Sequence, residues 1–273
     1  MTEQEIEAPR LSGWALVLGA SSGFGAATAL RLAKSGMNII GIHLDRRKAL
    51  PGVKALQEQI EACGSEAWFF NINASDADKR AATLQTITDK FAERGGNEQV
   101  RVLLHSLAFG SLGLYVTTDD TKPLTQKQIE MTQDVMAHSL VYWTQDLVAA
   151  DLLEDGGRIF AMTSTGSTGV FPGYGAVSAA KASLEAHIRQ LAYELAPKHI
   201  TANAICAGAA DTAALGKIPG GDTIQTRALE RNPYKRLTTP EDVALTIAGL
   251  AHPCTYWMTG NVIYVDGGEG HVN

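Results

Sequence analysis

The chain has 273 residues, of which 45% are hydrophobic and 19% are charged, and its formal net charge is −6. This balance is typical of a globular protein with a large core, and the acidic charge excludes a surface built for nucleic acid or for an anionic membrane. The three cysteines are too few and too widely spaced for a disulfide framework or a zinc site, and the N-terminal residues lack a secretory signal. We therefore expect a cytoplasmic protein with no membrane span and no metal.

Short apolar runs of strand length alternate with longer segments of helical spacing. The runs lie at 14–18, 38–44, 67–72, 100–104, 158–162, 201–205 and 262–265, and the helical segments lie at about 26–35, 50–62, 76–93, 125–150, 175–195 and 239–251. Nearly continuous hydrophobicity is typical of parallel strands that are covered on both faces. The alternation predicts a single α/β domain over residues 1–273, a doubly wound Rossmann fold with a seven-stranded parallel sheet.

The first predicted strand is followed by the glycine-rich turn Gly19-Ala-Ser21-Ser22-Gly23-Phe24-Gly25. Glycines permit a tight turn and a close approach to the backbone, and the helix that follows presents free N–H groups and a favourable dipole to an anion. The turn predicts a dinucleotide pyrophosphate site. Its G-x-x-x-G-x-G spacing differs from the general dinucleotide fingerprint and resembles that of the short-chain dehydrogenases/reductases, a resemblance that covers nearly the whole chain.

The resemblance places the choice between NADH and NADPH at the end of the second strand. An acidic residue there accepts the ribose hydroxyls of NAD, whereas a basic group accommodates the 2′-phosphate of NADP. His43 holds the usual position of the acid, and Arg46 and Arg47 follow, which favours NADPH. Asp45 keeps NADH open, because a shift of one residue would bring its carboxylate to the ribose, and the two arginines could instead be a solvated helix start.

A second segment, 163–181, differs from that of ordinary short-chain dehydrogenases. Those enzymes place Tyr four residues before Lys, but here that position is Val177, and Tyr174 lies seven residues before Lys181. Ser164 keeps the usual distance of 17 residues to the lysine. Seven helical steps of about 100° come within about 20° of two turns, so Tyr174 and Lys181 are expected on one helix face, one turn further apart than usual.

The displaced tyrosine has a chemical interpretation. In ketone reduction, hydride is added to the carbonyl carbon, and the acid serves the oxygen bonded to it. In a 2-enoyl thioester, hydride is added to C3, while negative charge develops on the thioester oxygen two carbons further along. An oxyanion stabiliser must lie where the charge appears, so the spacing favours conjugate reduction.

Tyr-x6-Lys is the spacing of the enoyl-acyl-carrier-protein reductases within this family. The runs Leu104–Gly110 and Asn203–Thr212 also resemble theirs, and the short phosphate turn makes the chain most similar to their type III, FabL-like branch, which uses NADPH. Two positions depart from the family. Ser164 stands where the main-type enzymes have another Tyr, and Met136 stands where ordinary members anchor a water relay with Asn, so a relay of that design is not expected.

The resemblance implies a role for each matching residue. Tyr174 would bond the enolate oxygen, Lys181 would hold the nicotinamide ribose, and Ser164 would either hold the thioester oxygen or orient Tyr174. Phe109 and Tyr234 are expected with Tyr174 at the acyl group. The remaining cofactor contacts are expected from Gly19, Ser21, Ser22, Gly23, Phe24, Gly25, His43, Arg46, Arg47, Asn73, Ala74, Ser106, Leu107, Ala108, Ala207, Gly208, Ala209 and Thr212.

The stretch 207–236 is irregular and interrupted by Gly and Pro, which predicts a substrate-binding loop, with an inert insertion as the alternative. Its basic residues, Arg227, Arg231, Lys235 and Arg236, would either dock an acidic acyl carrier protein or form a solvated helix face. We expect an enoyl thioester of acyl carrier protein or coenzyme A as substrate and, from the resemblance, a homotetramer. A carbonyl reductase or hydroxy-dehydrogenase of the same fold is the alternative activity, and a non-catalytic cofactor sensor is a further one.

Overall fold

The computed structural model describes residues 9–212, 216 and 221–272, and its centre is one parallel sheet. Seven strands pair in the order β3-β2-β1-β4-β5-β6-β7, all in parallel. The doubly wound prediction is therefore confirmed. The strands are β1 Trp14–Leu18, β2 Asn38–His43, β3 Ala67–Asn71, β4 Val100–His105, β5 Leu153–Thr163, β6 Thr201–Ala207 and β7 Val262–Val265.

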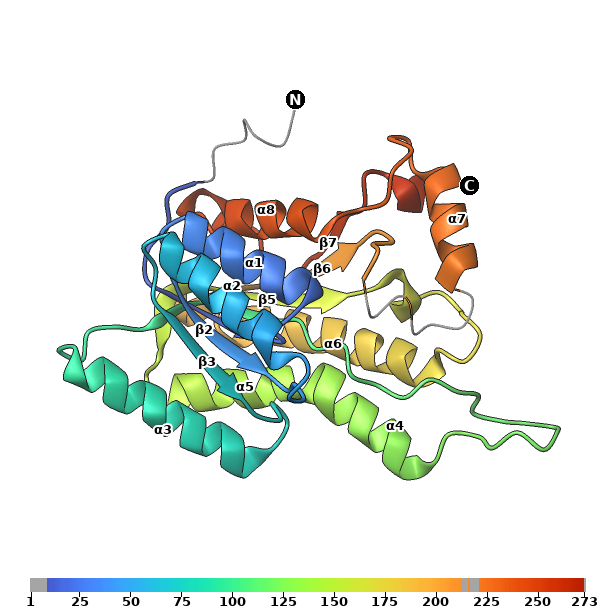
Figure 1. The fold of residues 1–273 in the computed structure, drawn as a ribbon, viewed down its shortest axis with the longest axis horizontal. Coiled ribbons are helices and arrows are strands. Elements are labelled where there is room, and N and C mark those ends of the chain that lie inside the picture. Colours follow the sequence, from blue (N-terminus) through green and yellow to red (C-terminus); the bar gives the residue numbers. More distant parts are fainter. Residues whose placement is uncertain (1–8, 213–215, 217–220, 273) are drawn as a thin grey trace.

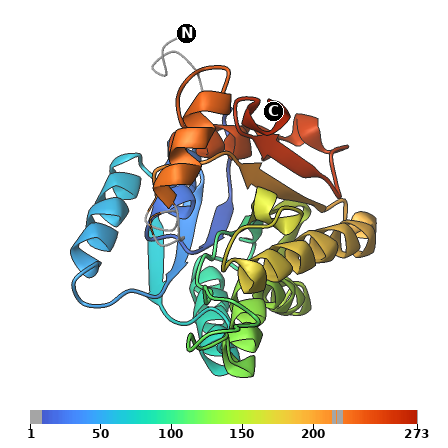
Figure 2. The same ribbon diagram turned by 90° about the vertical axis from the view of Figure 1, so that its right-hand side faces the viewer.

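Helices cover both faces of the sheet (Figures 1 and 2). One layer contains α1 Gly23–Lys34, α2 Leu50–Ala62 and α8 Pro240–Leu250, and the other contains α3 Ala77–Glu93, α4 Gln126–Gln133, α5 Ser139–Ala149 and α6 Gly175–Glu194. Each layer encloses its own hydrophobic cluster, because residues along the buried strands project alternately to the two faces. None of the described helices is both long and apolar enough to span a membrane.

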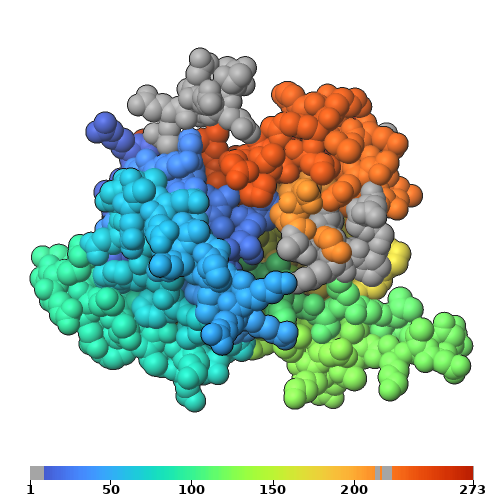
Figure 3. Space-filling model, in the orientation of Figure 1, coloured from blue at the N-terminus to red at the C-terminus, as the bar shows by residue number. Residues whose placement is uncertain are grey.

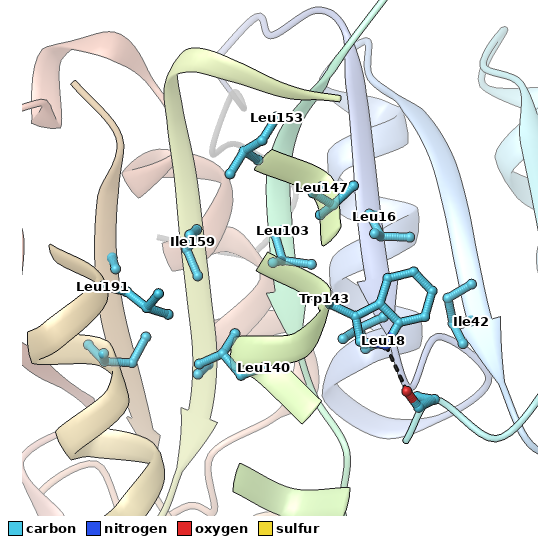
Figure 4. Packing of buried hydrophobic residues seen from close by; sticks show 14 of the residues in the cluster. Leu16, Leu18, Ile42, Leu103, Leu140, Trp143, Leu147, Leu153, Ile159 and Leu191 are labelled. Carbon is cyan, nitrogen blue, oxygen red and sulfur yellow. Dashed lines mark hydrogen bonds between the residues drawn. The ribbon is translucent and has the colours of Figure 1, made fainter. Parts of the chain in front are cut away.

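The larger cluster packs under α5 and α6. Trp143 of α5 is fully buried near Leu18 of β1 and Ile42 of β2, and its indole Nε1 donates a hydrogen bond to the carbonyl of Ala74 at 2.9 Å (Figure 4). This bond satisfies the polar atom that the large aromatic ring brings into the core. Trp143 thus joins the chain after β3 to the helix layer that contains α5.

Two helical segments differ from the prediction. Helix α7, Gly221–Arg231, occupies part of the stretch that was expected to be irregular. It is a polar helix followed closely by Pro233, so its sequence carries more turn signals than hydrophobic ones, and residues 213–215 and 217–220 of the stretch lie outside the described residues. The segment expected as one helix over 125–150 is interrupted by a π-helical turn, Asp134–His138, which separates α4 from α5. Such turns frequently mark functional positions in helices.

The strand order reverses between β1 and β4, since the chain first adds β2 and β3 on one side and later strands on the other. In an open parallel sheet the loops at the carboxyl ends of the strands diverge at such a point and leave a crevice. The phosphate turn after β1 and the segment after β4 both lie there. The fold thereby directs the search for a site to this edge.

Candidate active site

A cleft of about 1770 Å³ opens at the carboxyl ends of the strands. Figure 3 shows the hollow between the blue segment that follows β2 and the orange helix α7. Most of the residues predicted from the sequence meet in this cleft. They are Gly19, Ser21, Ser22, Gly23, Phe24, His43, Arg46, Asn73, Ala74, Ser106, Leu107, Ala108, Phe109, Ser164, Tyr174, Lys181, Ala207, Gly208, Ala209 and Thr212.

The glycine-rich turn has the geometry of an anion site. Gly19 and Gly23 adopt φ of +90° and +53°, which L side chains rarely adopt. Gly25 does not line the cleft but makes the turn possible, because a Cβ there would lie 2.0 Å from the carbonyl oxygen of Gly19. Ser22 caps α1 without a side-chain hydrogen bond, so its hydroxyl does not compete for the first N–H groups of the helix. The turn therefore fits a pyrophosphate.

The end of β2 carries an acidic and a basic group. His43 is buried, and its Nδ1 lies 3.0 Å from a carboxylate oxygen of Asp45. The backbone of Asp45 is fixed by a pair of 2.9 Å hydrogen bonds with the Asn71 side chain. Asp45 and Arg46 line the cleft, whereas Arg47 does not. The cleft at this end is thus lined by one carboxylate and one guanidinium.

Tyr174 lies at the start of α6, as its N-cap, and is buried with its ring against Gly166. Burial raises the pKa of its phenol, and a hydrogen bond with the hydroxyl of Ser164 offsets part of this rise by favouring the phenolate. Ser164 also accepts a 3.1 Å hydrogen bond from the N–H of Gly166. The geometry thus favours the orienting role for Ser164, and Tyr174 remains protonated and able to donate at neutral pH.

Lys181 is buried on α6, seven residues after Tyr174, and both line the cleft. Its ammonium donates a 2.6 Å hydrogen bond to the carbonyl of Met162 at the end of β5. Burial lowers the pKa of Lys181 to about 8, against the opposing negative charge of Glu185. The Glu185 carboxylate accepts a 2.6 Å hydrogen bond from the hydroxyl of Thr163, so it is held one helical turn beyond the lysine.

Two groups from distant parts of the chain reach the cleft near β6. Thr212 lies beside the phosphate turn, since a Cβ on Gly23 would be 4.0 Å from its methyl group. Glu269, close to the C-terminus, accepts a 3.1 Å hydrogen bond from the N–H of Ala209. Burial raises the pKa of this carboxyl. The amide of Ala209, expected to bind the cofactor, is therefore already bonded to a side chain.

The acyl end agrees with only part of the prediction. Phe109 lines the cleft, and so do Met136 from the π-helical turn and Phe171. Tyr234 does not, because it follows α7 in a turn where its side chain is 77% exposed, so its expected place at the acyl group is not supported.

The basic residues of the 207–236 stretch have different environments. Arg227 of α7 is exposed at the cleft, whereas Arg236 forms a double hydrogen bond with the Asp242 carboxylate. The Arg231 side chain donates to the carbonyl of Val272, and Lys235 donates to that of Glu230. Arg231 lines the cleft together with Arg227, and the side chains of Arg231, Lys235 and Arg236 are used in part to hold the loop and the chain end.

Sequence reasoning missed Glu269 and the buried His105. Glu269 gives no signal, because a carboxylate after the last strand looks like any solvated chain end. His105 was part of the matching run Leu104–Gly110, but nothing in the sequence shows that it is fully buried beneath α5.

The sequence profile described as enoyl-(acyl carrier protein) reductase matches residues 19–269. The chain belongs to this family of short-chain dehydrogenases/reductases. A relative from Enterococcus faecalis, named as an NADH-dependent enoyl-acyl-carrier-protein reductase, is 33% identical over 195 residues, which cover 71% of this chain and 74% of the relative.

Proteins named for the reduction of a carbonyl group are similar to the chain as well. A 3-oxoacyl-acyl-carrier-protein reductase from a Synechocystis strain is 32% identical over 258 residues, 93% of this chain and 95% of the relative. A solved structure of the reductase LugOII, described as catalysing a keto-reduction in lugdunomycin biosynthesis, is 26% identical and superimposes with a TM-score of 0.80 over 94% of this chain and 97% of that one. Family membership alone thus leaves open which double bond is reduced.

Proposed function

We propose that the protein reduces the 2,3 double bond of an enoyl thioester with a nicotinamide cofactor, as a step of fatty acid synthesis. The observation that carries this proposal is the seven-residue step from Tyr174 to Lys181, with both side chains in one cleft and Val177 buried in the usual place of the tyrosine. The phenol is thereby displaced along the cleft, toward the position where a thioester oxygen would develop charge.

Each residue of the site has a separate role in this proposal. The turn at Gly19–Gly25 binds the pyrophosphate, and Lys181 holds the nicotinamide ribose while its positive charge favours an electron-rich transition state. The bound cofactor supplies the hydride. Tyr174 donates its hydroxyl hydrogen bond to the enolate oxygen, Ser164 fixes the phenol, and Phe109, Met136 and Phe171 provide an apolar wall for the acyl chain.

NADPH is the cofactor that we propose, with NADH accepted more weakly, because Arg46 lines the cleft beside Asp45. Replacement of Arg46 by Ala should weaken NADPH binding about tenfold, the scale of one charge-assisted phosphate contact, and leave NADH unchanged. Arg47→Ala is the matched control, since Arg47 lies outside the cleft. Equal loss of both cofactors in Arg46→Ala would contradict the assignment.

The substrate would be carried by an acyl carrier protein, with coenzyme A thioesters as smaller analogues. Arg227→Glu should raise the KM for the carrier-bound substrate and spare the coenzyme A thioester, because only the former presents an acidic protein surface to α7. We further propose a cytoplasmic homotetramer that associates through the helix layer of α4, α5 and α6. Light scattering in solution tests the assembly.

The deciding experiment follows the absorbance of NADPH and of NADH with crotonyl and 2-octenoyl thioesters beside a panel of ketones and 3-oxoacyl thioesters. Turnover of the enoyl substrates that is lost in Tyr174→Phe supports the proposal. The similarity to a 3-oxoacyl-acyl-carrier-protein reductase makes carbonyl reduction the second candidate. Turnover of ketones alone would establish that candidate and refute ours.

A further inference from the structure

A buried histidine, His105, ends strand β4 beneath the helix layer beside the cleft. Its side chain is fully buried, and its Nε2 lies 2.9 Å from the hydroxyl oxygen of Ser139, the first residue of α5. That hydroxyl donates its single hydrogen to the carbonyl of Val135, at 2.8 Å. Ser139 must therefore accept from the imidazole, so Nε2 carries the proton and Nδ1 presents a bare lone pair.

The Nδ1 atom has no hydrogen-bond partner among residues 9–212, 216 and 221–272. A buried acceptor without a donor is unfavourable, and buried water commonly satisfies such atoms. The imidazole cannot avoid the problem by taking up a proton, because burial and the positive charge of Lys181 lower its pKa to about 3. The backbone carbonyls of His105 and Val135 oppose this lowering of the pKa without reversing it, so His105 is neutral at every pH at which the protein would work.

The register of the sheet places this acceptor close to Lys181. His105 is paired with Ala161 of β5, and the next residue of β5, Met162, supplies the carbonyl that holds the Lys181 ammonium. Paired residues of parallel strands project to the same face, and Ala161 belongs to the cluster beneath α5 and α6. The ammonium has three N–H groups, of which Met162 accepts one.

We propose that His105 is a positioning residue of this site: its Nδ1 accepts a hydrogen bond from a bound water that itself accepts one from the Lys181 ammonium. The water would satisfy both buried groups and hold the lysine charged and aimed at the cleft. This assignment rests on the proposed role of Lys181 in binding the cofactor. The other titratable groups that act on Lys181 are Glu185 on its own helix and Cys206 on β6, and both favour its charged form.

Two substitutions separate the nitrogens of the ring. The polar end of Asn in His105→Asn falls near the position of Nδ1, whereas the longer side chain of His105→Gln reaches the position of Nε2 and can still bond Ser139. If the water contact matters, Asn preserves the behaviour of Lys181 and Gln does not. If His105 serves only to bind Ser139, the order is reversed.

The test is the pH dependence of NADPH and NADH binding, followed by quenching of tryptophan fluorescence between about pH 6 and 10, the range in which Lys181 titrates. We expect the alkaline midpoint of binding to fall by about one pH unit in His105→Gln, which corresponds to a roughly tenfold weaker affinity above the midpoint. In His105→Asn the midpoint should stay within about 0.3 unit of the wild-type value. Ser139→Ala should lower the melting temperature and leave the midpoint in place. Wild-type behaviour of His105→Gln, or equal shifts in both His105 variants, would overturn the proposal.

A measurement on the unsubstituted protein tests the same assignment if the variants fail to fold. Histidine ¹⁵N spectra should show His105 protonated at Nε2, with an Nδ1 resonance shifted by an accepted hydrogen bond. A protonated Nδ1, or one with the shift of a free lone pair, would overturn the assignment. Neither experiment requires turnover. A protein that fails to reduce enoyl thioesters would contradict the proposed function without deciding the role of His105.

Discussion

Replacing Gly166 by Ala tests whether the position of Tyr174 limits the reaction. A Cβ on residue 166 would lie 2.5 Å from Cε1 and 3.0 Å from Cδ1 of the tyrosine ring. Carbon atoms in contact prefer a separation of about 3.5–4.0 Å, so the ring must withdraw by about 1 Å. A displacement of this size at a reacting group costs about a hundredfold in rate. We therefore expect kcat to fall about a hundredfold.

The assay is steady-state reduction of crotonyl thioester, with cofactor affinity measured separately. Overpacking at one contact destabilises a protein by about 1–3 kcal/mol, which lowers the melting temperature of a chain of this size by several degrees. NADPH binding should be unchanged, because the phosphate turn and Lys181 are not disturbed. Gly249→Ala on α8 is the matched control, since a Cβ there meets nothing within 4 Å. A wild-type kcat in Gly166→Ala would refute the placement of Tyr174 at the reacting oxygen.

Three further predictions concern single side chains. Ser164→Ala should raise the pKa of Tyr174 in a spectrophotometric titration and lower kcat about tenfold, because the hydroxyl favours the phenolate. The melting temperature should fall by only a few degrees, because the N–H of Gly166 loses its acceptor; loss of stability at a normal rate would contradict this. Burial lowers the pKa of Lys181 to about 8. Between about pH 8 and 10.5 this lysine is therefore deprotonated in the folded chain but still protonated in the unfolded chain. The free energy of unfolding should rise with pH over that interval, by up to about 3 kcal/mol. Urea unfolding of the wild type and of Lys181→Met, compared at both ends of the interval, measures this rise. Trp143→Phe should lower the free energy of unfolding by about 1–3 kcal/mol and spare kcat, since it leaves the buried carbonyl of Ala74 without its donor.

Much of the fold follows from the sequence, because a parallel sheet buries its strands on both faces. The run Trp14–Leu18 is buried at all five positions, and it was found by continuous hydrophobicity alone. The polar helix α7 was missed for the opposite reason. Over residues 223–231 of this helix, Ala228 is buried, Ile224 and Gln225 are half-buried and the rest are exposed, so its sequence shows little hydrophobic periodicity.

The residues of the candidate site likewise fall into those that the sequence could predict and those that it could not. Gly19, Gly23, Tyr174 and Lys181 are recognisable because each lies in a local pattern whose spacing has a chemical reason. Contacts between distant segments have no such pattern. The bond from Ala209 to Glu269 joins residues 60 positions apart, and only the folded chain brings them together.

Tyr174 precedes α6 as its N-cap, whereas Lys181 lies within the helix, so different parts of the chain position the two side chains. The lysine is fixed by a 20-residue helix packed on the sheet. The tyrosine instead ends the connection that begins after β5, and its place depends on the length of that connection. A change in the length of this connection would therefore move Tyr174, the proposed hydrogen-bond donor, along the cleft while α6 and the phosphate turn stayed intact. One scaffold could in this way acquire carbonyl and conjugate reduction as neighbouring specialisations, and insertions in the connection are where laboratory selection for a changed substrate should find its solutions.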